Sequence, residues 1–99
     1  MSRRVIERKL VGVGEQLRKL RGDLLLAEEQ LLYFQYEADE TRVRSFVSET
    51  ALSDRVHRSA ERYARIMQDH RDSLNLEIEK LEMDQNSLLD RLNSSINDS

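Results

Sequence analysis

Several residue types are scarce in this chain of 99 residues, and each absence excludes a class of protein. Cysteine is absent, which excludes a disulfide scaffold, a thiolate metal site and a cysteine nucleophile. Proline and tryptophan are also absent, so the chain has no Pro-rich linker, and only five residues are aromatic. The 38% of apolar residues can build a narrow seam but not the thick core of an α/β enzyme. We expect one small domain.

Long apolar runs are also absent. The longest is Leu24 to Ala27, far short of the roughly 20 residues that a membrane-spanning helix needs. The basic opening, residues 1–9, is not followed by the apolar region of a signal peptide. These features predict a cytoplasmic protein with no membrane insertion.

Apolar residues recur through the first half of the chain by alternate steps of four and three. Such a heptad pattern, sustained over more than four repeats, predicts one long helix over about residues 3–46. Gly12 and Gly14 weaken its start, and we expect the first 14 residues to fray rather than to approach another backbone closely. The seam consists of Ile6, Leu10, Val13, Leu17, Leu20, Leu24, Ala27, Leu31, Phe34 and Ala38.

Residues 47–53 interrupt this pattern with hydroxyl side chains, which satisfy the free N–H groups of a helix start. We therefore expect a turn there, a second helix over about residues 54–92 and a frayed polar tail over 93–99. The step of 11 residues from Met67 to Ile78 predicts a stutter with a half-buried His70 beside it. The second seam consists of Val56, Ala60, Tyr63, Met67, Leu74, Ile78, Leu81, Leu88 and Leu92, with Arg71 and Gln85 filling two positions.

The two seams agree in register if the chain folds back on itself. Residue numbers of facing positions then sum to 98, which predicts an antiparallel pair. The fold class is therefore all-α, with two long helices forming an antiparallel coiled-coil hairpin that could dimerise into a four-helix bundle. The facing pairs include Ile6 with Leu92, Leu10 with Leu88, Leu17 with Leu81, Leu20 with Ile78, Leu31 with Met67, Ala38 with Ala60 and Phe46 with Leu52.

The charge pattern also favours a hairpin. Residues 1–22 hold seven basic and two acidic side chains, whereas residues 23–40 hold six acidic side chains and no basic one. Residues 41–66 hold six basic and three acidic side chains, and residues 67–99 hold three and eight. Folding back sets blocks of opposite sign beside each other, whereas a parallel homodimer would set each block against itself.

Apolar residues beyond the two seams predict a docking surface. They are concentrated between Leu24 and Tyr36, and an apolar arc wider than one seam normally faces a further layer. The alternative is a scatter of single apolar residues, which is normal on a helical surface. We predict a non-enzymatic scaffold or adaptor that binds a protein partner or a second copy of itself. The predicted partner-binding residues are Leu25, Leu32, Tyr33, Tyr36 and Ile66.

Four arginines, Arg55, Arg58, Arg62 and Arg65, recur at helical spacing near the turn. The simplest interpretation is ion pairing with the acidic stretch 37–40 of the opposing helix. The alternative is an anionic-partner contact, which would make the protein a regulator docking on a nucleic-acid machine. The net charge of −3 argues against nucleic acid as a direct partner.

No pattern of residues predicts catalysis. The chain lacks a phosphate-binding glycine loop, a nucleophile elbow and the Glu-x-x-His pairs of a di-iron bundle. Asp54, His57 and Glu61 share a helical face and could hold a divalent metal, but helix capping and ion pairing explain them more simply. We therefore expect no enzymatic activity, no metal, no cofactor and no small-molecule substrate.

Three segments carry a resemblance to known proteins: residues 3–14 (RRVIERKLVGVG), 47–55 (VSETALSDR) and 57–62 (HRSAER). The chain resembles a group of small, uncharacterised coiled-coil proteins of actinobacteria over nearly its whole length. The resemblance implies a bacterial cytoplasmic setting and no activity that could be transferred. In architecture alone the hairpin is also similar to the helical-hairpin chaperones of flagellar and type III export, which implies no function.

Overall fold

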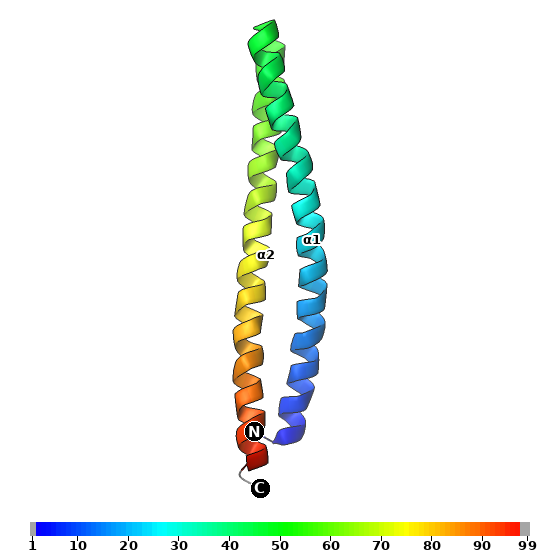
Figure 1. Ribbon diagram of the computed structural model, residues 1–99, viewed down its shortest axis with the longest axis vertical. Helices are drawn as coiled ribbons and strands as arrows, with labels where there is room; N and C mark the ends of the chain where they lie inside the picture. Colours follow the sequence, from blue (N-terminus) through cyan, green and yellow to red (C-terminus); the bar gives the residue numbers. More distant parts are fainter. Residues whose placement is uncertain (1, 98–99) are drawn as a thin grey trace. The chain divides into compact units, whose positions relative to one another are not determined.

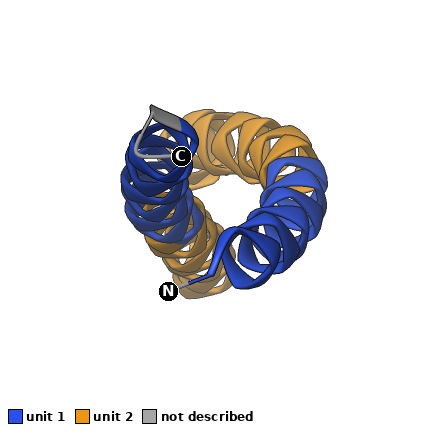
Figure 2. Ribbon diagram, turned by 90° about the horizontal axis from the view of Figure 1, so that it is seen from below, with its two compact units in different colours: residues 1–23, 74–99 blue, residues 24–73 orange. Residues whose placement is uncertain are grey.

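The computed structural model describes residues 2–97 and contains two helices in this range (Figure 1). Helix α1 spans Arg3–Ser48 and helix α2 spans Ala51–Asn97, with no strand among the described residues. The two helices form an antiparallel helical hairpin, which confirms the predicted fold class. Contacts divide the hairpin into two units, each containing a segment of both helices (Figure 2). Unit 1 contains Met1–Asp23 with Leu74–Ser99, and unit 2 contains Leu24–Ser73.

Hydroxyl side chains cap the start of both helices. The Val5 N–H donates to Ser2 Oγ at 3.3 Å, and the Ser53 N–H donates to Thr50 Oγ1 at 3.1 Å. Both contacts satisfy an N–H group that has no partner within its helix. Asp54 adds a negative charge in the first turn of α2, where the helix dipole favours it.

The turn between the helices contains only two residues, Glu49 and Thr50, so the predicted turn over residues 47–53 is too long. Glu49 has a φ of 49°, in the left-handed region, and its N–H donates to the Ser45 carbonyl at 3.0 Å. A left-handed residue just after a helix closes the last turn and reverses the chain at once. Because Thr50 caps α2 immediately afterwards, the helices gain residues that the sequence pattern assigned to the turn.

Replacing Glu49 with glycine is expected to raise the free energy of unfolding by about 0.5 to 1 kcal/mol. The gain comes from removing a β-carbon that disfavours the left-handed backbone, and it is offset in part by the greater freedom of glycine in the unfolded chain. Urea unfolding monitored by circular dichroism measures the difference. Glu49→Ala is the control, because it removes the carboxylate but keeps the β-carbon. An equal gain in both variants would contradict the backbone explanation.

The seam predicted for α1 is confirmed, because all ten of its positions are buried or partly buried. In unit 1 the buried residues are large and aliphatic, and they come from both helices. In unit 2 the seam contains more small and polar side chains, including the buried Ala27 and Thr41. The buried residues of unit 1 are Ile6, Leu17, Leu74, Ile78 and Leu88.

The first part of the seam predicted for α2 is wrong. Val56 and Tyr63 remain 48% and 54% exposed, and their neighbours His57 and Ala64 occupy the seam instead. Alternate steps of four and three then continue without interruption, so the predicted stutter is absent and His70 is exposed. The seam positions of α2, all buried or partly buried, are Ser53, His57, Ala60, Ala64, Met67, Arg71, Leu74, Ile78, Leu81, Gln85, Leu88, Leu92 and Ser95.

The physical reason for this shift is the partner that each position meets in unit 2. Positions whose residue numbers sum to 98 face each other, so His57 faces Thr41. These two residues form a contact of 3.2 Å between the helices. The same number pairs Ala64 with Phe34, where a small residue leaves room for a large ring. Tyr63 lies beside that ring, with the two ring centroids 5.8 Å apart. The register that the sequence predicts therefore holds, with different residues filling it.

The predicted core pair Phe46 and Leu52 is also wrong, because these side chains are 76% and 67% exposed. The α1 seam advances from Thr41 to the partly buried Ser45, so Phe46 falls outside it. The end of unit 2 next to the turn therefore has polar residues inside and large apolar residues outside.

The start of α1 and the end of α2 are both more regular than the sequence suggests. Helix α1 continues through Gly12 and Gly14, and a β-carbon built on either residue would meet no atom within 4 Å. The glycines therefore lie within α1, and no close backbone approach explains them. Helix α2 continues to Asn97 because an established helix adds residues cooperatively. The predicted end of the second helix at about residue 92 is therefore too early, and residues 98–99 of the predicted tail lie outside the described range.

Candidate interaction surface

The predicted partner-binding residues are all exposed in unit 2. Leu25, Leu32 and Tyr36 lie on the side of α1 that faces away from α2, and Tyr33 lies at the edge of that side, where it lines a depression with residues of α2. All four side chains are more than half exposed. Ile66 is exposed on α2. The structure therefore brings four of the five residues together on one helix and places the fifth on the other.

The exposed apolar surface of α1 is longer than the sequence analysis predicted. Val43, Phe46 and Val47 continue it towards the turn. Val43 follows Tyr36 by seven residues, and Phe46 and Val47 follow Val43 by three and four, which are helical spacings. The spacing of seven residues that links Leu25 to Leu32 and Tyr36 to Val43 is a signal that could have identified them. We call this surface the α1 stripe, and it consists of Leu25, Leu26, Leu32, Tyr33, Tyr36, Val43, Phe46 and Val47.

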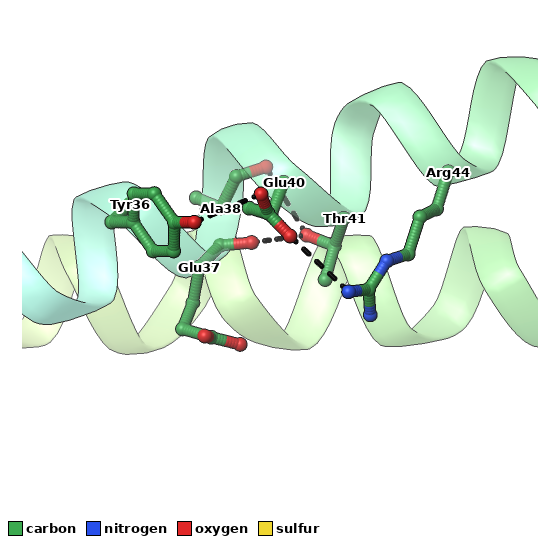
Figure 3. A network of polar contacts seen from close by, with 6 residues as sticks. All are labelled: Tyr36, Glu37, Ala38, Glu40, Thr41 and Arg44. Carbon is green, nitrogen blue, oxygen red and sulfur yellow. Dashed lines mark hydrogen bonds and ion pairs between the residues drawn. The ribbon is translucent and has the colours of Figure 1, made fainter.

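A polar network holds the middle of the α1 stripe (Figure 3). The Tyr36 hydroxyl donates to Glu40 Oε1 at 3.0 Å, and Arg44 Nη2 donates to Glu40 Oε2 at 3.2 Å. The hydrogen bond to Glu40 and the negative charge of its carboxylate raise the pKa of Tyr36 above its ordinary value of 10.0. Tyr36 therefore remains a neutral donor, with its phenol ring on the surface and its hydroxyl group anchored to the helix.

The four predicted arginines line a shallow depression of about 640 Å³ on α2, together with Ser59 and Glu61. We call these residues the arginine stripe: Arg55, Arg58, Arg62 and Arg65. Arg58 pairs with Asp54 at 3.2 Å, and Arg62 donates to Ser59 Oγ at 3.5 Å. Neither Arg55 nor Arg65 has a hydrogen bond or ion pair within the described part of the chain.

The expected pairing of these arginines with the acidic stretch of α1 is wrong. Every ion pair among residues 2–97 joins two residues of the same helix, and Glu40 pairs with Arg44 instead. The physical reason is direction, because Arg58, Arg62 and Arg65 lie on the side of α2 that faces away from α1. Arg55 lines an open depression beside Glu37 of α1 but forms no ion pair with it. The guanidinium groups of the arginine stripe are therefore available to an external partner.

Three aromatic residues form a cluster along one side of unit 2 that the sequence analysis did not identify. The rings of Tyr33 and Phe34 meet edge to face with centroids 5.4 Å apart, and Phe34 stacks on Tyr63. Together with Val56 and Thr41 they line an open depression of about 360 Å³. The cluster covers the seam where α2 contributes only small residues, and thus stabilises the hairpin there.

The polar contact between Thr41 and His57 belongs to the interior of unit 2. Thr41 is 5% exposed, and its hydroxyl donates to the carbonyl oxygens of Glu37 at 2.8 Å and Ala38 at 3.1 Å (Figure 3). His57 Nδ1 meets Thr41 Oγ1, and His57 Nε2 lies 3.0 Å from Glu61 Oε1. A hydroxyl that is buried and bonded to its own helix is a structural partner and not an exposed nucleophile.

Asp54, His57 and Glu61 do not converge on a common point. Glu61 contacts His57, whereas Asp54 contacts Arg58. Over residues 2–97 no group of three or more His, Asp or Glu side chains is placed to hold a metal ion. The polar side chains around these residues are used in capping and pairing.

The chain matches no protein-family model, no curated protein and no solved structure. Within the described residues, neither helix has a segment long and apolar enough to cross a membrane. The surfaces of unit 2 are therefore the main basis for an argument about function.

Proposed function

We propose that this protein is a non-enzymatic scaffold or adaptor whose α1 stripe binds a protein partner or a second copy of the chain. The observation that carries the proposal is the α1 stripe itself. Helix α1 already buries one apolar seam against α2, so a second apolar side has no function within the hairpin. Contiguous exposed apolar residues on a small domain mark an interaction surface.

The remaining features support a binding role over a chemical one. The polar contacts within unit 2 cap helices, join neighbours on the same helix, or join Thr41 to His57. The two depressions on its surface are open, and the one at the arginine stripe is lined by side chains of a single helix, whereas a small-molecule site is an enclosed cleft with apolar walls. We place this role in the cytoplasm of a bacterium, on the resemblance of the opening and turn segments to actinobacterial coiled-coil proteins.

A variant carrying Leu25→Glu and Leu32→Glu is expected to keep its helicity and lose its binding partner. Both side chains are exposed, so the carboxylates cost little folding free energy but disrupt an apolar interface. Circular dichroism, solution mass and capture of tagged protein from a lysate of the source organism measure the three properties. The matched control is Leu76→Glu with Met83→Glu, which changes two equally exposed apolar residues outside the α1 stripe.

The outcomes of this experiment separate the candidate functions. If the α1 variant keeps the solution mass and the bound proteins of the wild type, the proposal is wrong. Partners that disappear after nuclease treatment would instead favour a regulator that docks on a nucleic-acid machine.

A further inference from the structure

The two unused surfaces of unit 2 lie on opposite sides of the hairpin. Tyr36 falls midway between the seam positions Phe34 and Ala38, so it points away from α2. Arg62 falls midway between the seam positions Ala60 and Ala64, so it points away from α1. Each hairpin therefore presents the α1 stripe on one side and the arginine stripe on the other.

A second copy fits better on the outer side of α1, which faces away from α2, than on a face formed by both helices, as in a four-helix bundle. A four-helix bundle needs apolar residues beside the seam, because each helix then contacts two neighbours. In unit 2 the residues of α1 on both sides of the seam are all polar, and a bundle would bury them. These flanking residues are Glu28, Gln30, Gln35, Glu37, Arg42 and Arg44.

Charge decides which surface fits the α1 stripe. Between its apolar residues the stripe carries the carboxylates Glu29, Asp39 and Glu40, and within residues 2–97 only Glu40 has a basic partner, Arg44 at 3.2 Å. Packing two α1 stripes together would bring carboxylates of both copies into one interface, which opposes association. The arginine stripe supplies four guanidinium groups, which pair with carboxylates and stack on tyrosine rings.

We propose that copies of this chain pack side by side, with the α1 stripe of one copy against the arginine stripe of the next. If the turns of both copies lie at the same end, facing residue numbers again sum to 98 from the turn to Ile66. Apolar residues then meet each other at both ends of the contact, and Glu40 and the two tyrosine rings meet arginines, while Val43 packs on the aliphatic stem of Arg55. Beyond that point Glu29 would face Asp69, so the contact ends there. The facing pairs are Phe46 with Leu52, Val43 with Arg55, Glu40 with Arg58, Tyr36 with Arg62, Tyr33 with Arg65 and Leu32 with Ile66.

This arrangement also provides a use for two features that the single hairpin leaves unexplained. Phe46 and Leu52 are exposed within one copy, but they meet between copies. Arg65 has no polar partner among residues 2–97, and it gains the Tyr33 ring of the next copy. The contact joins two different surfaces, so it adds copies one after another until a ring closes or a filament forms. This inference rests on the proposed function and names the partner of the α1 stripe.

Two complementary variants test the arrangement. Arg58→Glu with Arg62→Glu disables the arginine stripe, and Leu32→Lys with Phe46→Lys disables the α1 stripe. All four side chains are exposed, so both proteins should fold, and circular dichroism checks this. Arg4→Glu with Arg18→Glu is the matched control, because it applies the same charge change to exposed arginines outside both stripes. Analytical ultracentrifugation over a concentration series gives the mass of each protein.

The wild type and the control are expected to self-associate, and each variant alone should associate more than about tenfold more weakly. A mixture of the two variants should form a complex of two copies, because each retains the surface that the other lacks. Assembly of the arginine variant alone, with the lysine variant monomeric, would show α1-to-α1 pairing and overturn the inference while leaving the proposed function in place. A monomeric wild type, or a mixture that forms no complex, would also overturn it.

Discussion

Truncation of Leu17 to alanine is expected to lower the free energy of unfolding by about 2 to 5 kcal/mol. Leu17 is 1% exposed, so the substitution removes buried apolar surface and leaves a cavity between the helices of unit 1. Domains of this kind are stable by only about 5 to 15 kcal/mol, so the loss is a large share of the total. Urea unfolding followed by far-ultraviolet circular dichroism measures it.

The control for Leu17 is a leucine in the same helix on its exposed side. Leu25→Ala should change the free energy of unfolding by less than about 0.5 kcal/mol, because this side chain is 67% exposed. A comparable loss in both variants would mean that the surface assigned to the α1 stripe is buried in solution. Concentration dependence of that loss would identify burial by a second copy.

Replacement of Thr41 with valine is expected to cost about 1 to 3 kcal/mol, although the two side chains have the same shape. The hydroxyl accounts for the cost, because Thr41 Oγ1 is the interhelical partner of His57 Nδ1 at 3.2 Å. The side chain of His57 is only 14% exposed, so its ring nitrogen would lose a partner in a position where water reaches it poorly.

The double variant Thr41→Val with His57→Leu tests this explanation. Removing both polar groups leaves an apolar pair, so the double variant should be more stable than Thr41→Val alone. The coupling between the two sites, measured by urea unfolding of the four proteins of the cycle, should be about 1 kcal/mol or more. Additive losses would show that the Thr41 contact with His57 contributes nothing beyond packing.

The two proposals about function depend on different residues and can fail separately. The scaffold role depends on the apolar residues of the α1 stripe, whatever protein covers them. The side-by-side arrangement depends in addition on Arg58 and Arg62, which make no contact with α1 in the described residues. A partner that needs Leu32 but not these arginines would keep the first proposal and exclude the second.

The elements that the sequence predicted correctly share a long regular repeat. Ten α1 positions from Ile6 to Ala38 were expected in the seam, and all ten are buried or partly buried. The sum of 98 was also predictable, because two periodic seams joined by a short turn can match in few ways. The exposure of the four predicted partner-binding residues on α1 was predictable for the same reason, since they are surplus to that repeat.

The errors share a different cause, which is that local hydrophobicity does not show what a residue will face. Val56 and Tyr63 are more apolar than His57 and Ala64, yet the latter pair lies in the seam. His57 can enter because Thr41 contacts it, and Ala64 fits because the register places it opposite the ring of Phe34. The sequence also did not show that most of these arginine side chains point away from α1, the helix that carries their predicted carboxylate partners.

The sequence by itself determined that this protein is an antiparallel pair of helices in one register, because the heptad repeat and the charge blocks admit little else. Only the tertiary structure decided where that repeat runs between Ser53 and Met67, how tightly the chain turns at Glu49, and which side of each helix remains uncovered. These features depend on residues distant in the chain, such as Thr41 beside His57. The spacing of residues along one helix does not reveal such contacts, since they form only when two helices pack together.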